Sequence, residues 1–124
     1  MEFKESGVQE SGATLPLVPT LTRAKEETMA AYVISEVEVL DPVLFDKYRS
    51  LAQDNIAKYG GRYVVRGGAI EPVEGGWAPK HIVIVEFPTM ERARAWYQSP
   101  EYSEALQVRQ KALNRKLIFV EGVG

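Results

Sequence analysis

The segment His81–Phe87, HIVIVEF, decides the fold. Successive side chains of a β-strand point to opposite faces, so Val83, Val85 and Phe87 share one face and the two isoleucines share the other. Because both sets are apolar, neither face suits water, and the pattern predicts a strand that is covered on both sides. Glu86 lies on the isoleucine face, where a charged side chain needs a partner.

Composition indicates one soluble domain. The chain has 124 residues, of which 45% are hydrophobic and 26% charged, the balance of a globular protein with a single core. No apolar run approaches the roughly 20 residues of a membrane-spanning helix, and the N-terminus lacks a signal-peptide pattern, so we expect a cytoplasmic protein without membrane contact. The chain contains no cysteine, which excludes disulfides and zinc–thiolate sites.

The net charge of −2 argues against a nucleic-acid partner. Residues 29–124 hold 12 basic and 12 acidic side chains, so the acidic excess belongs to residues 1–28. Proteins that bind nucleic acids usually carry a basic surplus. Residues 1–28 also follow no helix or strand period, and we predict an N-terminal extension or linker there and one domain over residues 29–124.

The first half of the domain predicts a strand, a helix and a second strand. Ala31–Val39 alternates as a strand does. A helix should begin at Asp41-Pro42, where Asp caps free N–H groups, and end at Gly60-Gly61, where glycine accepts the C-cap conformation. Arg62–Val73 predicts a strand with a bulge at Gly67-Gly68, followed by the loop EGGWAPK.

The second half predicts a crossover in two helical pieces. Pro88 ends the central strand and Thr89 caps one helix, and Ser99-Pro100 begins another that should run to about Asn114. Lys116–Glu121, KLIFVE, is the last predicted strand. The order βαββαβ is that of a ferredoxin-like α+β fold with a four-stranded antiparallel sheet, whose second helical crossover is broken in two.

A sheet of this kind has helices on one face only, so the other face of the apolar strands needs a different cover. Each fully buried Val, Ile or Phe contributes about 1.5–3 kcal/mol. The sheet of a second identical subunit would bury that face. We therefore predict a homodimer in which two sheets pair into a dimeric α/β barrel.

Four blocks of the sequence resemble a known family: AYVISEVEVLDP, YGGRYVVRGG, IVEFPTMERARAWYQSPEYSEALQVRQKA and LIFVEGV. They resemble the uncharacterised bacterial family called domain of unknown function thirteen-thirty, within the dimeric α/β-barrel superfamily, over Met29–Val123. The resemblance implies a ferredoxin-like subunit that pairs with a second one, and no established activity. The wider superfamily includes small cofactor-free monooxygenases, isomerases and haem-binding or haem-degrading enzymes, which is an analogy at the level of the fold.

Three charged residues are candidates for chemistry. Glu86 inside a barrel would have a raised pKa and could act as a general base, and the alternative is a structural ion pair. Arg109 lies on the apolar line of its predicted helix and could hold a carboxylate, or could extend its charged head into water. Arg66 could bind an anion beside the glycine bend, or be a solvated residue at a bulge.

Aromatic residues and the single histidine complete the candidate ligand-binding set. His81 could titrate near neutral pH or, by analogy with the superfamily, ligate haem, or it could be merely polar. One histidine cannot form a multi-histidine metal site, and we expect no metal. Trp77 could close a pocket or contact a second subunit, and we favour the subunit contact. Tyr32, Tyr97 and Tyr102 could line a cavity or belong to the core.

Two functions of different classes fit these residues. The first is a small-molecule-binding dimer, and one form of this function is a cofactor-independent enzyme of the isomerase or monooxygenase type that acts on a small anionic or carbonyl compound. The second is a non-catalytic dimeric interaction or regulatory module. No phosphate loop, dinucleotide fingerprint or Ser–His–Asp signature is present, so we expect no cofactor, and the sequence leaves open whether the protein is an enzyme.

Overall fold

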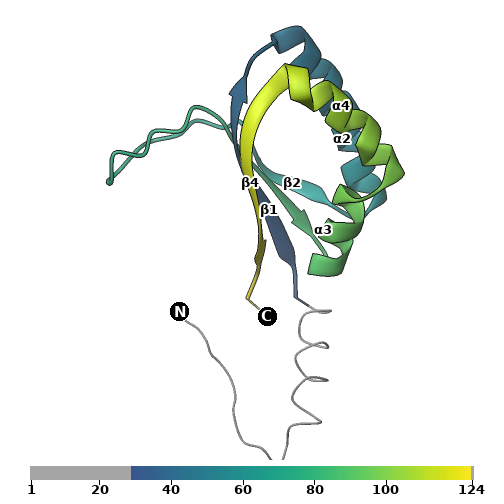
Figure 1. Cartoon of the computed structure of the whole chain (residues 1–124). Coiled ribbons are helices and arrows are strands. Elements are labelled where there is room, and N and C mark those ends of the chain that lie inside the picture. Colours follow the sequence, from purple (N-terminus) through teal and green to yellow (C-terminus); the bar gives the residue numbers. More distant parts are fainter. Residues whose placement is uncertain (1–28, 124) are drawn as a thin grey trace, which may run out of the picture.

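Figure 1 shows the computed structural model of the chain, in which residues 29–123 are described. The elements of this part are, in order, β1 (Ala31–Val39), α2 (Pro42–Lys58), β2 (Arg62–Arg66), β3 (Ile82–Phe87), α3 (Met90–Tyr97), α4 (Pro100–Ala112) and β4 (Leu113–Glu121). This order confirms the predicted ferredoxin-like α+β fold and the crossover in two helices. The N-terminal extension that we predicted over residues 1–28 lies outside the described residues.

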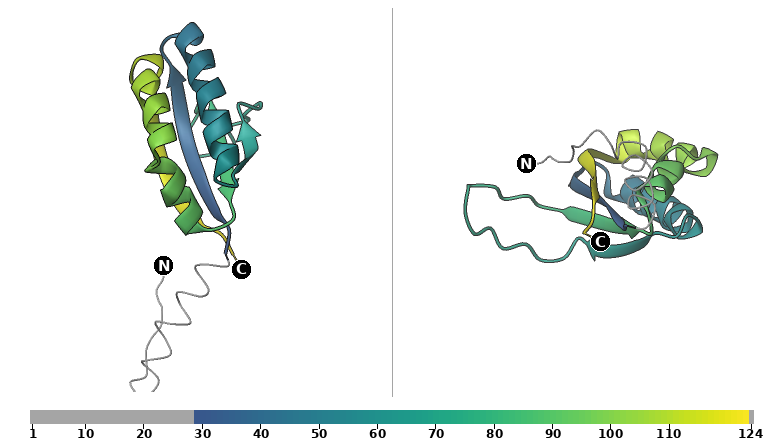
Figure 2. Two further views of the ribbon diagram at one scale, coloured as in Figure 1. Left: turned by 90° about the vertical axis from the view of Figure 1, so that its right-hand side faces the viewer. Right: turned by 90° about the horizontal axis from the view of Figure 1, so that it is seen from below.

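The four strands form one antiparallel sheet in the order β2-β3-β1-β4. The helices all cover the same face of this sheet, as the two views of Figure 2 show. We call this the helix face and the opposite one the open face. No helix of residues 29–123 is long and apolar enough to cross a membrane.

The core lies between the helix face and the three helices. On β1 the side chains alternate as predicted, and Ala31, Val33 and Val37 are buried on the helix face. The buried residues of α2 recur at steps of three and four, which places Phe45 and Ile56 against the sheet. Phe87, from the segment that decides the fold, is fully buried in this layer.

The break between α3 and α4 is made by a buried serine. The hydroxyl of Ser99 donates to the carbonyl oxygen of Trp96 at 2.8 Å and accepts from the N–H of Tyr102 at 3.1 Å. Pro100 follows at the first position of α4, where its missing N–H is not needed. One side chain therefore ends one helix and begins the next.

Replacing Ser99 by Ala should lower the free energy of unfolding by about 1 kcal/mol, the usual cost of a lost N-cap. The buried N–H of Tyr102 would then have no acceptor. Urea unfolding of the Ser99→Ala protein measures this loss. Ser103→Ala is the matched control, because Ser103 is an exposed residue of the same helix, and an equal loss in both proteins would contradict the role of the cap.

The open face carries an uncovered apolar row. Ile34 of β1 pairs with Ile84 on one side and with Ile118 on the other, so three isoleucines lie across three strands. The side chain of Ile118 is 57% exposed, and that of Val120 is 40% exposed. The apolar second face that the sequence predicted is therefore present in the subunit.

Two predictions are wrong at β2, namely where the strand ends and where its bulge lies. The strand ends at Arg66 and not at Val73, because Gly67 has a φ of +72° and its N–H bonds to Ile82 at 3.0 Å, which closes the ladder. Residues 67–80 form a long loop, which we call the arm, and it projects away from the helices (Figure 1). The bulge lies at Val64 and not at Gly67-Gly68.

The junction of α4 and β4 also differs from the prediction. The helix ends at Ala112 and not near Asn114, and the strand begins at Leu113, three residues early. The carbonyl oxygen of Ala112 accepts from the N–H groups of Leu40 and Asp41, at 2.8 and 3.1 Å. This contact with the end of β1 supplies donors for one of the carbonyls that a helix end leaves without an intrahelical partner.

Candidate functional site

A small cavity lies between the helix face of the sheet and the helices. Its volume is about 40 Å³, room for roughly three water molecules at 10–15 Å³ each. Most of its wall consists of apolar strand and helix side chains. The polar lining residues are Ser35, Tyr48, Arg49, Tyr63, Arg66, His81 and Arg115.

The guanidinium of Arg115 is the central polar group of this cavity. Its Nη1 donates to the hydroxyl oxygen of Tyr48 and its Nη2 to that of Tyr102, both at 2.8 Å. The two hydroxyl oxygens lie 2.6 Å apart. No carboxylate of residues 29–123 forms an ion pair with Arg115. We call these three residues the Arg115 cluster.

Three separate elements bring the Arg115 cluster together. Arg115 follows Leu113 on the same face of β4, and it pairs with Val37 across the strands, so its side chain points toward the helices. Tyr48 comes from the buried face of α2 and Tyr102 from that of α4. The tyrosine rings meet edge to face at 6.4 Å between centroids.

The surroundings keep the cluster cationic. Burial alone would lower the pKa of Arg115, but the oxygens of Tyr48 and Tyr102 more than offset this, so its pKa is raised and the guanidinium stays charged. Burial, followed by the neighbouring Tyr48, raises the pKa of Tyr102, which therefore remains a phenol near neutral pH. A positive charge without an acidic partner is thus held in the cavity wall.

Further cationic groups stand around the cavity. Because of the bulge at Val64, Arg66 pairs with Val83 and turns to the helix face, where its guanidinium lies over the ring of Tyr63 at 4.5 Å. It also donates to Gln53 at 3.2 Å. Arg49 of α2 lines the same cavity. Because Arg49 is ion-paired with Asp46 at 2.8 Å, Arg66 is the residue that adds positive charge to that of Arg115 for an approaching anion.

His81 lies where the arm meets β3. Its ring packs edge-on against Phe45, with 5.6 Å between centroids. Burial, followed by the charge of Arg49, lowers the pKa of His81, so the imidazole is neutral at about pH 7. An open groove of about 760 Å³ at the base of the arm shares His81, Val37 and Arg115 with the cavity, so the two spaces adjoin.

Glu86 lies on the open face, away from this cavity. Its carboxylate accepts from the hydroxyl of Tyr32 at 2.8 Å and from Nε of Arg62 at 2.7 Å. These hydrogen bonds, with Tyr32 the larger cause, lower the pKa of Glu86 despite some burial. The raised pKa that we expected is wrong, because the carboxylate has partners that stabilise its charged form.

The lowered pKa of Glu86 predicts how the stability of the protein should depend on pH. In the folded state the pKa of Glu86 lies below its ordinary value of 4.5. The stabilisation contributed by the ionised carboxylate is therefore fully present above pH 4.5 and is lost as the pH falls through the pKa of the folded state. A Glu86→Gln protein should therefore be less stable than the wild type at about pH 7, and the difference should be smaller at about pH 3, below the ordinary pKa. Urea unfolding at both pH values measures the difference, and an advantage of wild type that grew in acid would contradict the ion pair.

A family model matches residues 30–123, which is most of the chain. The chain belongs to the family described as Domain of unknown function (DUF1330). The family that the sequence resembled is thereby confirmed. No curated protein matches this DUF1330 chain.

Solved structures similar to the DUF1330 chain share its fold at low sequence identity. The RPA0582 protein of unknown function from Rhodopseudomonas palustris is 18% identical, with a TM-score of 0.64 over 87% of this chain and 93% of that one. SnoaB, a cofactor-independent oxygenase from Streptomyces nogalater, is 11% identical, with a TM-score of 0.55 over 78% and 95%. A dimeric protein of unknown function and ferredoxin-like fold from Bacteroides fragilis is 11% identical, with a TM-score of 0.51 over 77% and 97%.

The structure brings some of the predicted site residues to the cavity and leaves others away from it. Arg66 and His81 line the cavity, and Tyr102 reaches it through Arg115. Tyr32 shares the open face with Glu86. The sequence analysis missed Arg115, which it placed between a helix and a strand.

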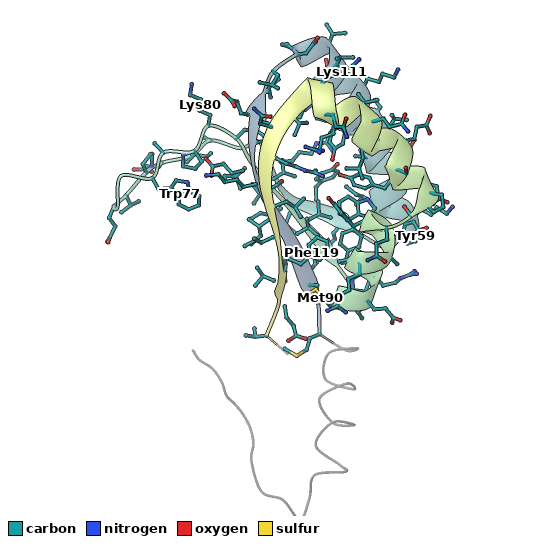
Figure 3. All side chains as sticks on the ribbon, viewed as in Figure 1. Tyr59, Trp77, Lys80, Met90, Lys111 and Phe119 are labelled. Carbon is teal, nitrogen blue, oxygen red and sulfur yellow. The ribbon has the colours of Figure 1, made fainter. Side chains whose placement is uncertain are left out.

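The remaining candidates lie elsewhere in the DUF1330 subunit. Trp77 sits on the arm, 62% exposed and separated from the helices (Figure 3). Tyr97 packs on the ring of Phe119 at 6.0 Å. Arg109 does not line the cavity, and its Nε is buried without a hydrogen-bond partner. Among residues 29–123 no three His, Asp or Glu side chains form a group that could hold a metal ion.

Proposed function

We propose that this DUF1330 protein is a small-molecule-binding protein that takes a small anionic or carbonyl compound into the cavity beside Arg115. The observation that carries the proposal is the partly buried guanidinium of Arg115, which bonds to two phenols and to no carboxylate of residues 29–123. A charge held away from water without a counter-charge is costly. A carboxylate ligand would supply the counter-charge, since it accepts two N–H groups of a guanidinium at once.

The rest of the cavity supports a small organic anion. Its walls are largely apolar, and Arg66 adds positive charge. Because the cavity alone has room for roughly three water molecules, the ligand would extend from Arg115 into the adjoining groove of about 760 Å³, which Arg115 also lines. By contrast, the geometry gives no support to Glu86 as the general base of such a site, because that carboxylate is ion-paired on the opposite face. Arg115 and Tyr48 take the place that we had assigned to Glu86 and Arg109.

The proposal extends to catalysis, in which the binding protein acts as a cofactor-independent enzyme of the isomerase or monooxygenase type. The similarity to SnoaB supports a fold that can serve such an enzyme and does not identify a reaction.

One observation favours the alternative, a non-catalytic dimeric interaction or regulatory module. The bridge between Glu86 and Arg62 is a structural ion pair, at 2.7 Å, on the face that would pair with a second subunit.

The proposal includes a homodimer in the cytoplasm. The row formed by Ile34, Ile84 and Ile118 would leave water when a second sheet packs on the open face. Burying such side chains contributes about 1.5–3 kcal/mol each. The similar protein from Bacteroides fragilis is described as dimeric, which supports the same arrangement here. Trp77 on the arm would then contact the second subunit, as we predicted.

Native mass spectrometry of the purified full chain tests both parts of this function. We expect twice the mass of the chain, with additional mass from a retained small acid in part of the population. A monomer would overturn the homodimer. A dimer that neither retains nor, on titration with pyruvate, binds a small carboxylate would overturn the ligand proposal and leave the interaction module.

A further inference from the structure

The hydrogen bonds of the Arg115 cluster leave one proton without an acceptor. A guanidinium only donates, and each phenol has one O–H to donate and an oxygen that accepts. Both phenol oxygens accept from Arg115, and one phenol donates to the other across 2.6 Å. Of the two phenolic protons, only one is thereby used within residues 29–123.

Burial indicates which tyrosine keeps the unused proton. Tyr102 has no exposed surface, and its ring is packed against Trp96 at 4.3 Å and against Tyr97 at 5.7 Å. It does not line the cavity, whereas Tyr48 does. The hydroxyl of Tyr102 therefore donates to Tyr48, and the hydroxyl of Tyr48 is left to donate into the cavity.

We propose that Tyr48 donates this hydrogen bond to the 2-oxo group of a 2-oxo acid whose carboxylate is bound by Arg115. The inference rests on the proposed function and names its ligand class. The two donor atoms, Nη1 of Arg115 and the hydroxyl oxygen of Tyr48, lie 2.8 Å apart. Two oxygens on neighbouring carbonyl carbons, turned to the same side, lie about 2.7 Å apart by standard bond lengths, so a 2-oxo acid presents its acceptors at the spacing of the donors.

The site thus distinguishes a 2-oxo acid from a plain carboxylate. A plain acid can satisfy Arg115 but leaves the hydroxyl of Tyr48 without an acceptor in a largely apolar cavity. A site built to donate to a substrate oxygen rejects the analogue that lacks it, because its own polar group is left unpaired. Tyr48 is therefore a specificity-determining residue.

The test compares pyruvate with propanoate, which have the same number of carbons and the same charge. Titration calorimetry gives both dissociation constants for the wild type, for Tyr48→Phe and for the matched control Tyr102→Phe, which removes the other hydroxyl of the pair. We expect the wild type to prefer pyruvate by roughly tenfold, the equivalent of one buried hydrogen bond. Tyr48→Phe should lose the preference with its propanoate affinity little changed, and Tyr102→Phe should keep it.

The outcomes separate this inference from the proposed function. Equal binding of the two acids by the wild type, or a preference for pyruvate that persists in Tyr48→Phe, would overturn the role of Tyr48 and leave the anion site standing. Failure of both acids to bind would overturn the anion site itself, and this inference with it. Each variant keeps the aromatic ring, and a thermal melt confirms that it is folded before titration.

Discussion

An Arg115→Met protein should bind pyruvate at least about tenfold more weakly than the wild type while remaining folded. A charge-assisted hydrogen bond contributes roughly 1.5–3 kcal/mol, and the substitution removes every donor of the guanidinium. Met is unbranched and fills a similar volume, so the packing around Tyr48 and Tyr102 should persist. Titration calorimetry measures the affinity.

Stability is the second half of this prediction. Replacing a buried charge by an apolar side chain is often neutral or stabilising, and the hydrogen bond between Tyr48 and Tyr102 does not need Arg115. The melting temperature of Arg115→Met should therefore stay the same or rise. Arg92→Gln, at an exposed position of α3, is the control for loss of a positive charge. A variant that melted far lower but still bound pyruvate would show that Arg115 serves the fold and not a ligand.

Phe87→Ala should have the largest effect on stability, a loss of about 3–5 kcal/mol in the free energy of unfolding. Phe87 is fully buried, and its ring lies 5.4 Å from that of Trp96. It also touches Gly61 so closely that a methyl group there would come within 2.7 Å of the ring. Truncation would leave a cavity that neighbours this tightly packed cannot fill.

Because small domains are stable by about 5–15 kcal/mol in total, this change alone removes a large part of that margin. Urea unfolding at a fixed protein concentration measures it, since a dimer makes stability depend on concentration. Val73→Ala on the arm is the control, because Val73 is 85% exposed and should change stability by less than about 0.5 kcal/mol. A loss below about 1 kcal/mol in Phe87→Ala would contradict the packing described for the core.

Local patterns were enough to predict most of the fold. The alternation of β1 and the spacing of Phe45 and Ile56 on α2 depend on the geometry of one strand and one helix. The caps at Asp41 and Ser99 depend on a side chain and the next three residues, and both make the hydrogen bonds predicted for them. The boundaries that were wrong are those decided by contacts between distant segments, such as the bond from Asp41 to Ala112.

Local sequence patterns could not predict the candidate site. Tyr48 and Tyr102 are 54 residues apart in sequence, and each resembles a core aromatic of its own helix. Arg115 had no predicted element, although its position two residues after Leu113 and two before Leu117 would have put it on the same face once the strand was extended. Glu86 attracted attention because it is charged within an apolar strand, yet Arg62 on the next strand neutralises it.

The sequence by itself determined the order of the elements, the two apolar faces of the sheet and the family. Those properties follow from periods of two and 3.6 residues and from caps a few residues long, which act within one segment. Only the tertiary structure decided that Arg115 meets two tyrosines instead of a carboxylate, and that Glu86 meets Arg62 and Tyr32. The partner of a charged side chain depends on strand register, and a single bulge at Val64 is enough to turn the next arginine to the other face.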